Sequence, residues 1–321
     1  MVNTEIINKN SMRSKFILFT LLVLFLCNTN KAQTFNADTF KLVKNNSHYL
    51  FSTKINNKIE GTFLLESGIH AMLIDSLFAF KNQSSLNIDF IKNKKNEKMN
   101  LGGRVYNITH KAKGKIQLTN HIIYEGEIFL LSNYKSTYDI AIPIQYLYNE
   151  RSKKNCIIKL DLKNHLLEIL SENELKKEKN KYSKVKMNFD NYLHMPSIKT
   201  KLTIFEGGKK RTLAGNFNLD LGNAAFIFFF KQNKSVQEFV CKNSDIKLQP
   251  AYNKKGMLIA EAFTTAECEL CNVLFNNHII AITEVLPKFT TEGDIGIKFF
   301  EKSPVIFDFD KSNFYVKKES Y

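Results

Sequence analysis

The sequence predicts an all-β fold of two similar β-barrel-like lobes with a cleft between them. Two segments carry this prediction, residues 61–69 and 215–223, because both read Gly-x-Phe-x-Leu-acid-x-Gly-x. Alternating apolar residues that end in a carboxylate, a spacer and a glycine are typical of a strand that enters a tight turn. The two acids, Glu66 and Asp220, are 154 residues apart in a chain of 321 residues, which is close to half of its length.

Further landmarks recur in the same order after each acid. Glycine-tipped hairpins are expected at Gly102-Gly103 and at Gly256, and Gly102 and Gly256 each follow their acid by 36 residues. Asp-Ile-Ala-Ile at residues 139–142 matches Asp-Ile-Gly-Ile at residues 294–297. This repetition indicates an internal duplication of an all-β unit of about 130 residues, a size that suits one compact lobe.

The first lobe is assigned to residues 33–170 and begins with a hairpin over residues 48–65. Asn56-Asn57 separates its two alternating runs and favours a two-residue turn with positive φ. A polar connection is expected between a short strand at 71–74 and residue 92. The other expected elements are strands at 115–118, 127–131 and 139–142, a helical turn at 144–148, and a closing pair at 156–162 and 165–170.

The second lobe is assigned to residues 187–321 and repeats this pattern. Residues 171–186 are densely charged and nearly free of apolar side chains, which predicts a linker between the lobes. The strands expected in the second lobe lie at 194–203, 212–219, 224–230, 258–263, 273–282, 294–297, 305–310 and 313–316.

Residues 1–32 have the pattern of a signal peptide. Arg13 and Lys15 precede an apolar run over residues 16–27, which is too short to span a bilayer. Cleavage is expected near Ala32, and Cys27 as the cysteine of a lipoprotein anchor is the alternative. The sequence therefore predicts an exported protein, periplasmic or secreted, without an integral membrane span.

The chain is basic, with a formal net charge of +15. Residues 1–32 hold four bases and one acid, so +12 remains after their removal. The lysines stand in short runs within polar stretches, without interleaved aromatic residues and without a nucleic-acid-binding motif. This pattern favours a solvated surface over an anionic partner, and we expect no nucleic-acid partner.

Four cysteines remain after residue 32: Cys156, Cys241, Cys268 and Cys271. Only Cys268 and Cys271 have a spacing found in metal sites, and a second pair of ligands is missing, so we expect no metal and no cofactor. Export permits disulfides, but their pairing cannot be read from the sequence. Motifs of serine hydrolases, zinc peptidases and phosphate-binding loops are absent from the sequence.

The two acid-x-Gly turns, the glycine hairpins and the apolar-apolar-Gly segments resemble those of the aspartic peptidases, in particular retropepsin-like bacterial proteins with two lobes in one chain. The resemblance covers nearly all of residues 45–318. It implies that Glu66 and Asp220 form a catalytic pair that shares one proton and activates a water molecule. It also implies a cleft and hairpin flaps that bind an extended peptide. The implied substrate-binding residues are Ser67, Gly68, Gly102, Gly103, Tyr106, Gly222 and Gly256.

Three positions depart from the pattern of this family. Glu66 replaces an aspartate, and its extra methylene moves the carboxylate by roughly 1–1.5 Å, enough to affect catalysis. Leu221 lacks the hydroxyl that ties the two turns together, and Ala141 replaces a glycine that Gly296 keeps. Two functions stay open: a peptidase with an atypical carboxylate pair, or an inactive pseudopeptidase that binds a peptide or protein segment.

Overall fold

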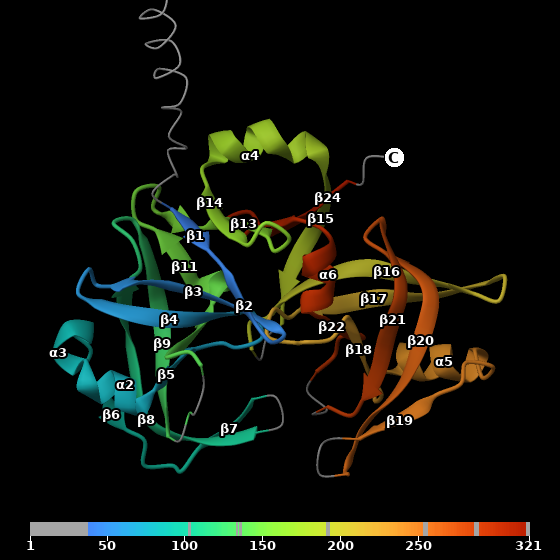
Figure 1. Cartoon of the computed structure of the whole chain (residues 1–321), viewed down its shortest axis with the longest axis horizontal. Helices are drawn as coiled ribbons and strands as arrows, with labels where there is room; N and C mark the ends of the chain where they lie inside the picture. The colour runs from blue at the N-terminus through green and yellow to red at the C-terminus, as the bar shows by residue number, and fades with distance from the viewer. Residues whose placement is uncertain are drawn as a thin grey trace, which may run out of the picture. The chain divides into compact units, whose positions relative to one another are not determined.

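The computed structural model describes residues 38–101, 104–132, 134, 137–190, 193–252, 256–285 and 289–318. The predicted signal peptide, with Cys27, and the glycines Gly102 and Gly103 lie outside the described residues. The structure is 56% strand and 14% helix, which confirms the all-β prediction. The two lobes are coloured blue to green and yellow to red in Figure 1.

The first lobe is a sheet in which the acid-bearing strand lies between one antiparallel and one parallel neighbour. Its main strands follow in the order β3 (His48–Ile55), β4 (Ile59–Glu66), β10 (Ile140–Pro143), β5 (Met72–Asp75), β9 (Ile122–Ser132) and β8 (Arg104–Gln117). Shorter elements complete the lobe: β2 (Val43–Asn45), α2 (Ser76–Lys81), α3 (Gln83–Leu86), β6 (Ile91–Lys92), β7 (Lys98–Leu101), η1 (Ile144–Tyr146), β11 (Leu147–Asn149) and β12 (Lys154–Asn155).

Helix α2 lies within the stretch that the sequence analysis expects to be a polar connection. Asp75 caps it, because its carboxylate accepts a hydrogen bond of 3.0 Å from the backbone N–H of Leu77. The helix has six residues and buries only Ala79, which explains why its sequence shows no clear helical periodicity.

The turn at Asn56-Asn57 joins the ends of the first-lobe sheet. Both residues have positive φ, 49° and 59°, as the sequence predicts. The backbone N–H of Asn56 donates to the carbonyl of Gln117 at 2.9 Å, and the Asn56 side-chain oxygen accepts from the Gln117 N–H at 2.9 Å. The side-chain amide of Asn56 also donates to the carbonyls of Ser85 and Leu86. One asparagine therefore holds β8 and α3 against the β3–β4 hairpin.

The second lobe has the same strand order as the first. Its main strands are β16 (Pro196–Glu206), β17 (Lys209–Leu219), β22 (Gly293–Ile295), β18 (Ile227–Phe230), β21 (Val273–Thr283) and β20 (Leu258–Leu270). Here β16 also pairs with β20, so the six strands close into a barrel. Three further elements are α5 (Lys234–Lys242), β19 (Gln249–Tyr252) and α6 (Ile297–Lys302). This shared order is what the internal duplication predicts.

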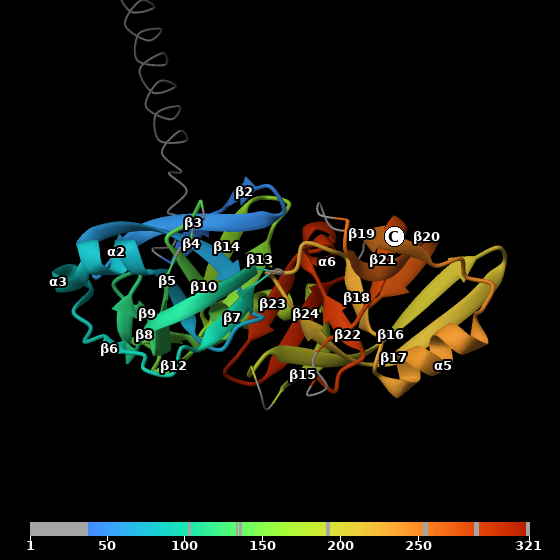
Figure 2. The same cartoon turned by 90° about the horizontal axis from the view of Figure 1, so that it is seen from below.

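A central sheet joins the lobes. Its strands follow in the order β1 (Thr39–Lys41), β14 (Leu166–Leu170), β13 (Ile157–Asp161), β23 (Val305–Asp308), β24 (Asn313–Lys317) and β15 (Tyr182–Phe189). The antiparallel pair of β13 from the first lobe and β23 from the second lies at its middle, as Figure 2 shows. The closing strands of both lobes therefore form one continuous hydrogen-bonded layer.

The predicted linker is part of this structured core. Residues 171–186 form α4 (Glu172–Glu178), η2 (Lys179–Lys181) and the first half of β15. A capping box between Ser171 and Glu174 starts α4, and Leu175 and Tyr182 are buried against the central sheet. The sequence analysis underestimates the order of this segment because only a few apolar side chains among many charges anchor it.

The strand register corrects one of the sequence landmarks. β10 pairs with β4 so that Pro143 lies opposite Glu66, and β22 pairs with β17 so that Gly296 comes next to Asp220. Pro143 is therefore the counterpart of Gly296, and the match of Ala141 to Gly296 is wrong. Spacing from the acid could not decide this, because Ala141 and Pro143 follow Glu66 by 75 and 77 residues and Gly296 follows Asp220 by 76.

Gly296 is expected to tolerate no side chain. A Cβ at this position would overlap the carbonyl oxygen of Ala225 and lie 2.7 Å from that of Asn223, and both are backbone atoms. Gly296→Ala should therefore lower the free energy of unfolding by about 1–3 kcal/mol, measured by urea denaturation. Gly114→Ala is the control, because its Cβ would meet only the side chains of Ile88 and Ile128 at ordinary contact distances. If Gly296→Ala and Gly114→Ala unfold at the same urea concentration, Gly296 tolerates a side chain and the prediction is wrong.

Candidate functional site

The two acids lie at the ends of equivalent strands, and each carboxyl group lies against the glycine of the other turn. A Cβ on Gly222 would overlap the Glu66 carboxyl group, and a Cβ on Gly68 would lie 2.7 Å from Asp220 Oδ1. Both acids are half-buried. The structure therefore brings Glu66, Gly68, Asp220 and Gly222 together, and the absent side chains of the two glycines make the room for the carboxyl groups.

The two turns make the same internal hydrogen bond, but its length differs between them. The backbone N–H of Gly222 donates to Asp220 Oδ1 at 3.0 Å, whereas the N–H of Gly68 donates to Glu66 Oε2 at 3.4 Å. The extra methylene of Glu66 carries its carboxyl group past the best position for this bond. The glutamate is therefore held more loosely by its own turn than the aspartate.

Ser67 joins the two turns. Its hydroxyl donates to the carbonyl of Leu219 at 2.7 Å and accepts from the N–H of Leu221 at 2.9 Å. Leu221 is buried and has no polar side-chain atom to return such a bond, so the tie comes from the first lobe alone. The side-chain amide of Gln145 supports the turn by donating to the carbonyls of Ser67 and Ile69. The Ser67 hydroxyl, predicted to contact substrate, is fully buried and holds the two turns together.

The electrostatics of the pair favour a shared proton. Burial raises the pKa of Glu66 above that of an ordinary carboxyl group, and the negative charge of Asp220 raises it further. Burial also raises the pKa of Asp220, against the opposing effect of the N–H groups of Gly222 and Asn223. Two carboxyl groups this close resist ionising together, so the pair retains a proton at a pH where exposed carboxyl groups have lost theirs.

A third carboxyl group near the pair belongs to Asp294. Burial raises its pKa well above the usual range, and the charge of Asp220 raises it further. The side-chain amide of Asn218 donates to Asp294 Oδ1 at 2.9 Å. The sequence analysis used Asp294 only as a repeat landmark. Only the strand register, which the sequence does not give, sets Asp294 beside Asn218, and Asn218 lies two residues before Asp220.

A cavity of about 470 Å³ opens beside Glu66. Most of its lining comes from the first lobe: the β2–β3 turn, β3, β4, the β7–β8 hairpin and the loop before β10. Two residues of the second lobe complete it. They are Asn45, Asn46, Ser47, His48, Leu50, Leu64, Glu66, Leu101, Arg104, Tyr106, Tyr134, Thr137, Tyr138, Gly222 and Ala224. The cavity therefore adjoins Glu66, and the β7–β8 hairpin forms part of its lining.

The hairpin residues predicted to bind substrate have different positions. Tyr106 lines the cavity, and its ring packs edge-on against that of Tyr134 at 5.2 Å between centroids. Gly256 lies in the second-lobe hairpin with a φ of 75°, and open space surrounds the position of its missing Cβ. It is not among the residues that line the cavity. The equivalent tip of the first hairpin, with Gly102 and Gly103, lies outside the described residues.

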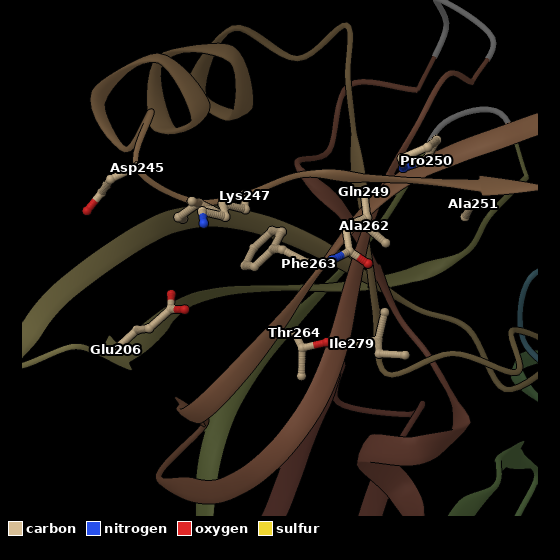
Figure 3. A pocket seen from close by; sticks show the side chains of 11 residues that line it. Glu206, Asp245, Lys247, Gln249, Pro250, Ala251, Ala262, Phe263, Thr264 and Ile279 are labelled. Carbon is tan, nitrogen blue, oxygen red and sulfur yellow. The ribbon is translucent and has the colours of Figure 1, made fainter.

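A second hollow, of about 530 Å³, lies on the second lobe where β20 passes from pairing with β19 to pairing with β16. Figure 3 shows the side chains that line it, among them Glu206, Asp245 and Phe263. Arg211 forms ion pairs with Asp245 at 2.6 Å and with Glu206 at 3.4 Å. Lys209 and Arg211 hold the pKa of Asp245 below its usual value. These acids are neutralised by cations, so this hollow is poorly suited to acid–base catalysis.

Other kinds of site find little support in the described part of the chain. No group of three or more His, Cys, Asp or Glu residues there could hold a metal ion. Cys156, Cys241, Cys268 and Cys271 are free thiols, and burial raises the pKa of Cys156, Cys268 and Cys271. A raised thiol pKa disfavours the nucleophilic thiolate. Every helix in the described residues is too short or too polar to cross a lipid bilayer.

No protein-family model matches the chain, and no curated protein matches it. The function is therefore inferred from the site.

Removal of the Ser67 hydroxyl is expected to weaken the contact between the turns. Ser67→Ala leaves the carbonyl of Leu219 and the N–H of Leu221 without a hydrogen-bond partner, which should lower the free energy of unfolding by about 2–4 kcal/mol. Urea denaturation measures the effect, and Ser52→Ala, at an exposed position on β3, is the control. If Ser67→Ala lowers the free energy of unfolding no more than Ser52→Ala does, the Ser67 hydrogen bonds do not stabilise the fold.

The raised pKa of Glu66 predicts a pH-dependent effect of Glu66→Gln on stability. A carboxyl group with a folded pKa above its unfolded pKa binds more protons in the folded state, so its stabilisation is complete at low pH and is lost as pH rises through the folded pKa. The glutamine cannot ionise. The melting temperature of Glu66→Gln relative to wild type should therefore increase from pH 4 to pH 8. Glu60→Gln, at an exposed position on the same strand, is the control. If the difference in melting temperature between Glu66→Gln and wild type does not change with pH, the pKa of Glu66 is not raised.

Proposed function

We propose that the protein is an exported peptidase of the aspartic-peptidase type that hydrolyses extended peptides with the Glu66–Asp220 pair. The observation that carries this proposal is the placement of each carboxyl group over the glycine of the opposite turn. Such a pair, with raised pKa values and a cavity beside it, has the parts that acid–base hydrolysis of a peptide bond needs.

The proposed reaction uses the single shared proton. The ionised carboxyl group takes a proton from a water molecule while the water oxygen bonds to the carbonyl carbon of the peptide. The protonated carboxyl group gives its proton to the carbonyl oxygen, which produces a tetrahedral diol. When the diol collapses, one of its hydroxyl protons returns to a carboxylate and the other carboxyl group protonates the nitrogen. The C–N bond then breaks, and the pair again holds one proton.

The fold supports the same proposal. Two lobes with one strand order each deliver one acid, and a serine ties their turns. The β7–β8 hairpin contributes Leu101, Arg104 and Tyr106 to the cavity, in the position expected of a flap over an extended peptide. The predicted signal peptide over residues 1–32 supports action outside the cytoplasm, in the periplasm or after secretion.

A specific observation favours the second candidate function, a pseudopeptidase that binds a peptide or protein segment without cutting it. Glu66 replaces the usual aspartate, and its hydrogen bond from Gly68 is long at 3.4 Å. A misplacement of about 1 Å at a reacting group can lower the rate about 100-fold. The cleft would then keep its binding surface and lose most of its catalysis.

Digestion of a mixed peptide library by purified 33–321 protein tests the proposal. Wild type is expected to cleave, whereas Asp220→Asn and Glu66→Gln should lower kcat/KM about 10²- to 10⁴-fold because each removes one partner of the proton transfer. Pepstatin should inhibit the wild type. Glu66→Asp shows whether the shorter acid improves the rate. If the folded wild-type protein cleaves nothing between pH 3 and pH 8, the peptidase proposal fails and the binding function takes its place.

The pH dependence of cleavage follows from the raised pKa values of both acids. The pair holds one proton in a pH range above about 4, where ordinary carboxyl groups titrate. A plot of kcat/KM against pH should therefore be bell-shaped, with both apparent pKa values above about 4 and the optimum above about pH 5. An optimum near pH 3 would contradict the expected shift.

A further inference from the structure

The two lobes differ at three register-equivalent positions beside the carboxyl pair. In the first lobe, Leu50, Leu64 and Ala141 lie opposite one another on β3, β4 and β10. All three are buried in one apolar cluster, and Leu50 and Leu64 line the cavity beside Glu66. The first-lobe side of the cleft is therefore apolar at this point.

The second lobe has polar residues at the same positions. Ser197, Asn218 and Asp294 lie opposite one another on β16, β17 and β22. Asn218 precedes Asp220 by two residues, as Leu64 precedes Glu66, so the side chains of the two residues point to the same face of their strands as the acids do. Three apolar side chains of one lobe are thus replaced by three polar ones in the other.

This polar group has more acceptors than donors. Asn218 is 1% exposed, and its side-chain oxygen has no hydrogen-bond partner. Asp294 is half-buried, and the side-chain amide of Asn218 is the only side chain among the described residues found to donate to it. A buried acceptor without a partner costs about 1–3 kcal/mol. A ligand that donates hydrogen bonds would remove this cost.

Two negative charges of the described residues act on Asp294. Asp220 and Asp190 both act on it and raise its pKa. The Asp190 carboxylate accepts hydrogen bonds from the backbone N–H groups of Leu193 and Met195. No ion pair joins Asp294 to a lysine, arginine or histidine of the described residues. Among the described residues Asp294 therefore has no cationic partner, although the chain has a net charge of +15.

We propose that Ser197, Asn218 and Asp294, on the second lobe beside Asp220, form a subsite that binds a lysine or arginine side chain of the peptide. The inference rests on the proposed function of the Glu66–Asp220 site. The cationic group donates hydrogen bonds to the Asp294 carboxylate and to the free Asn218 oxygen, which supplies both the missing charge and the missing donor. The apolar first-lobe side, with Leu50 and Leu64, takes an apolar side chain of the same peptide.

The test compares peptides that are identical except for lysine, norleucine or glutamate at one position, scanned over the four residues around the cleaved bond. Norleucine keeps the aliphatic chain of lysine without its charge. At one position, wild type should prefer lysine to norleucine by about 10- to 100-fold in kcat/KM, the range for a hydrogen bond to a charged group. Asp294→Ala, which introduces the first-lobe residue, should abolish this preference, so that the kcat/KM values for the lysine and norleucine peptides become equal.

Two further variants control for misfolding and for a general loss of negative charge. Asp294→Asn keeps the shape of the side chain and removes only its charge, so it also should lose the lysine preference even if Asp294→Ala folds poorly. Asp89→Ala removes an exposed negative charge from the first lobe and should retain the preference. Higher ionic strength should reduce the preference of the wild type less than it would for an exposed charge pair, because Asp294 is half-buried.

The outcomes separate this inference from the proposed function. If the wild type cleaves lysine and norleucine peptides equally, or if Asp294→Ala slows all peptides alike, the subsite proposal is overturned and the peptidase proposal stands. If nothing is cleaved, fluorescence anisotropy with labelled peptides gives the same comparison as a ratio of Kd values. A lysine preference that is lost in Asp294→Ala then supports the subsite in a binding protein. If no peptide is bound or cleaved, both proposals fail.

Discussion

The close approach of two carboxyl groups is the constraint on which the site depends. Glu66 and Asp220 lie against each other's turn glycine, without a cation to neutralise them among the ion pairs of the described residues. Two negative charges at this place would push the lobes apart. A retained proton removes much of that repulsion, and the Ser67 hydroxyl bonds hold the turns in contact. The charge repulsion and the proposed chemistry therefore have one origin.

The two lobes have diverged in complementary ways around this contact. The first lobe has the hydroxyl at Ser67, and the second has the aspartate at Asp220 and the packing glycine at Gly296. One serine makes both hydrogen bonds to the opposite turn, so Leu221 can be apolar without loss of the tie. Asn218 and Asp294 stand where the first lobe has apolar residues, so the two lobes differ in chemistry beside the carboxyl pair, which a symmetric dimer of one lobe could not do.

Much of the fold could be predicted from local patterns, and the misses have identifiable causes. The hairpin turn at Asn56-Asn57 and the acid-x-Gly turns were predicted because positive φ and close packing leave specific residues in the sequence. The strand β15 was missed because the charged residues around Tyr182 concealed it. The match of Ala141 to Gly296 failed because strand register depends on pairing between distant segments.

The sequence by itself determined most of the strands, the repeated pattern of the two halves and the positions of the two acid-x-Gly turns, since these depend on residue types within a few positions of one another. Only the tertiary structure decided that the acids meet, that Ser67 joins their turns, and that Asp294 lies beside them. Those facts depend on side chains that are more than 70 residues apart in the chain. Burial shifts their pKa values, and burial exists only once the two lobes have packed against each other.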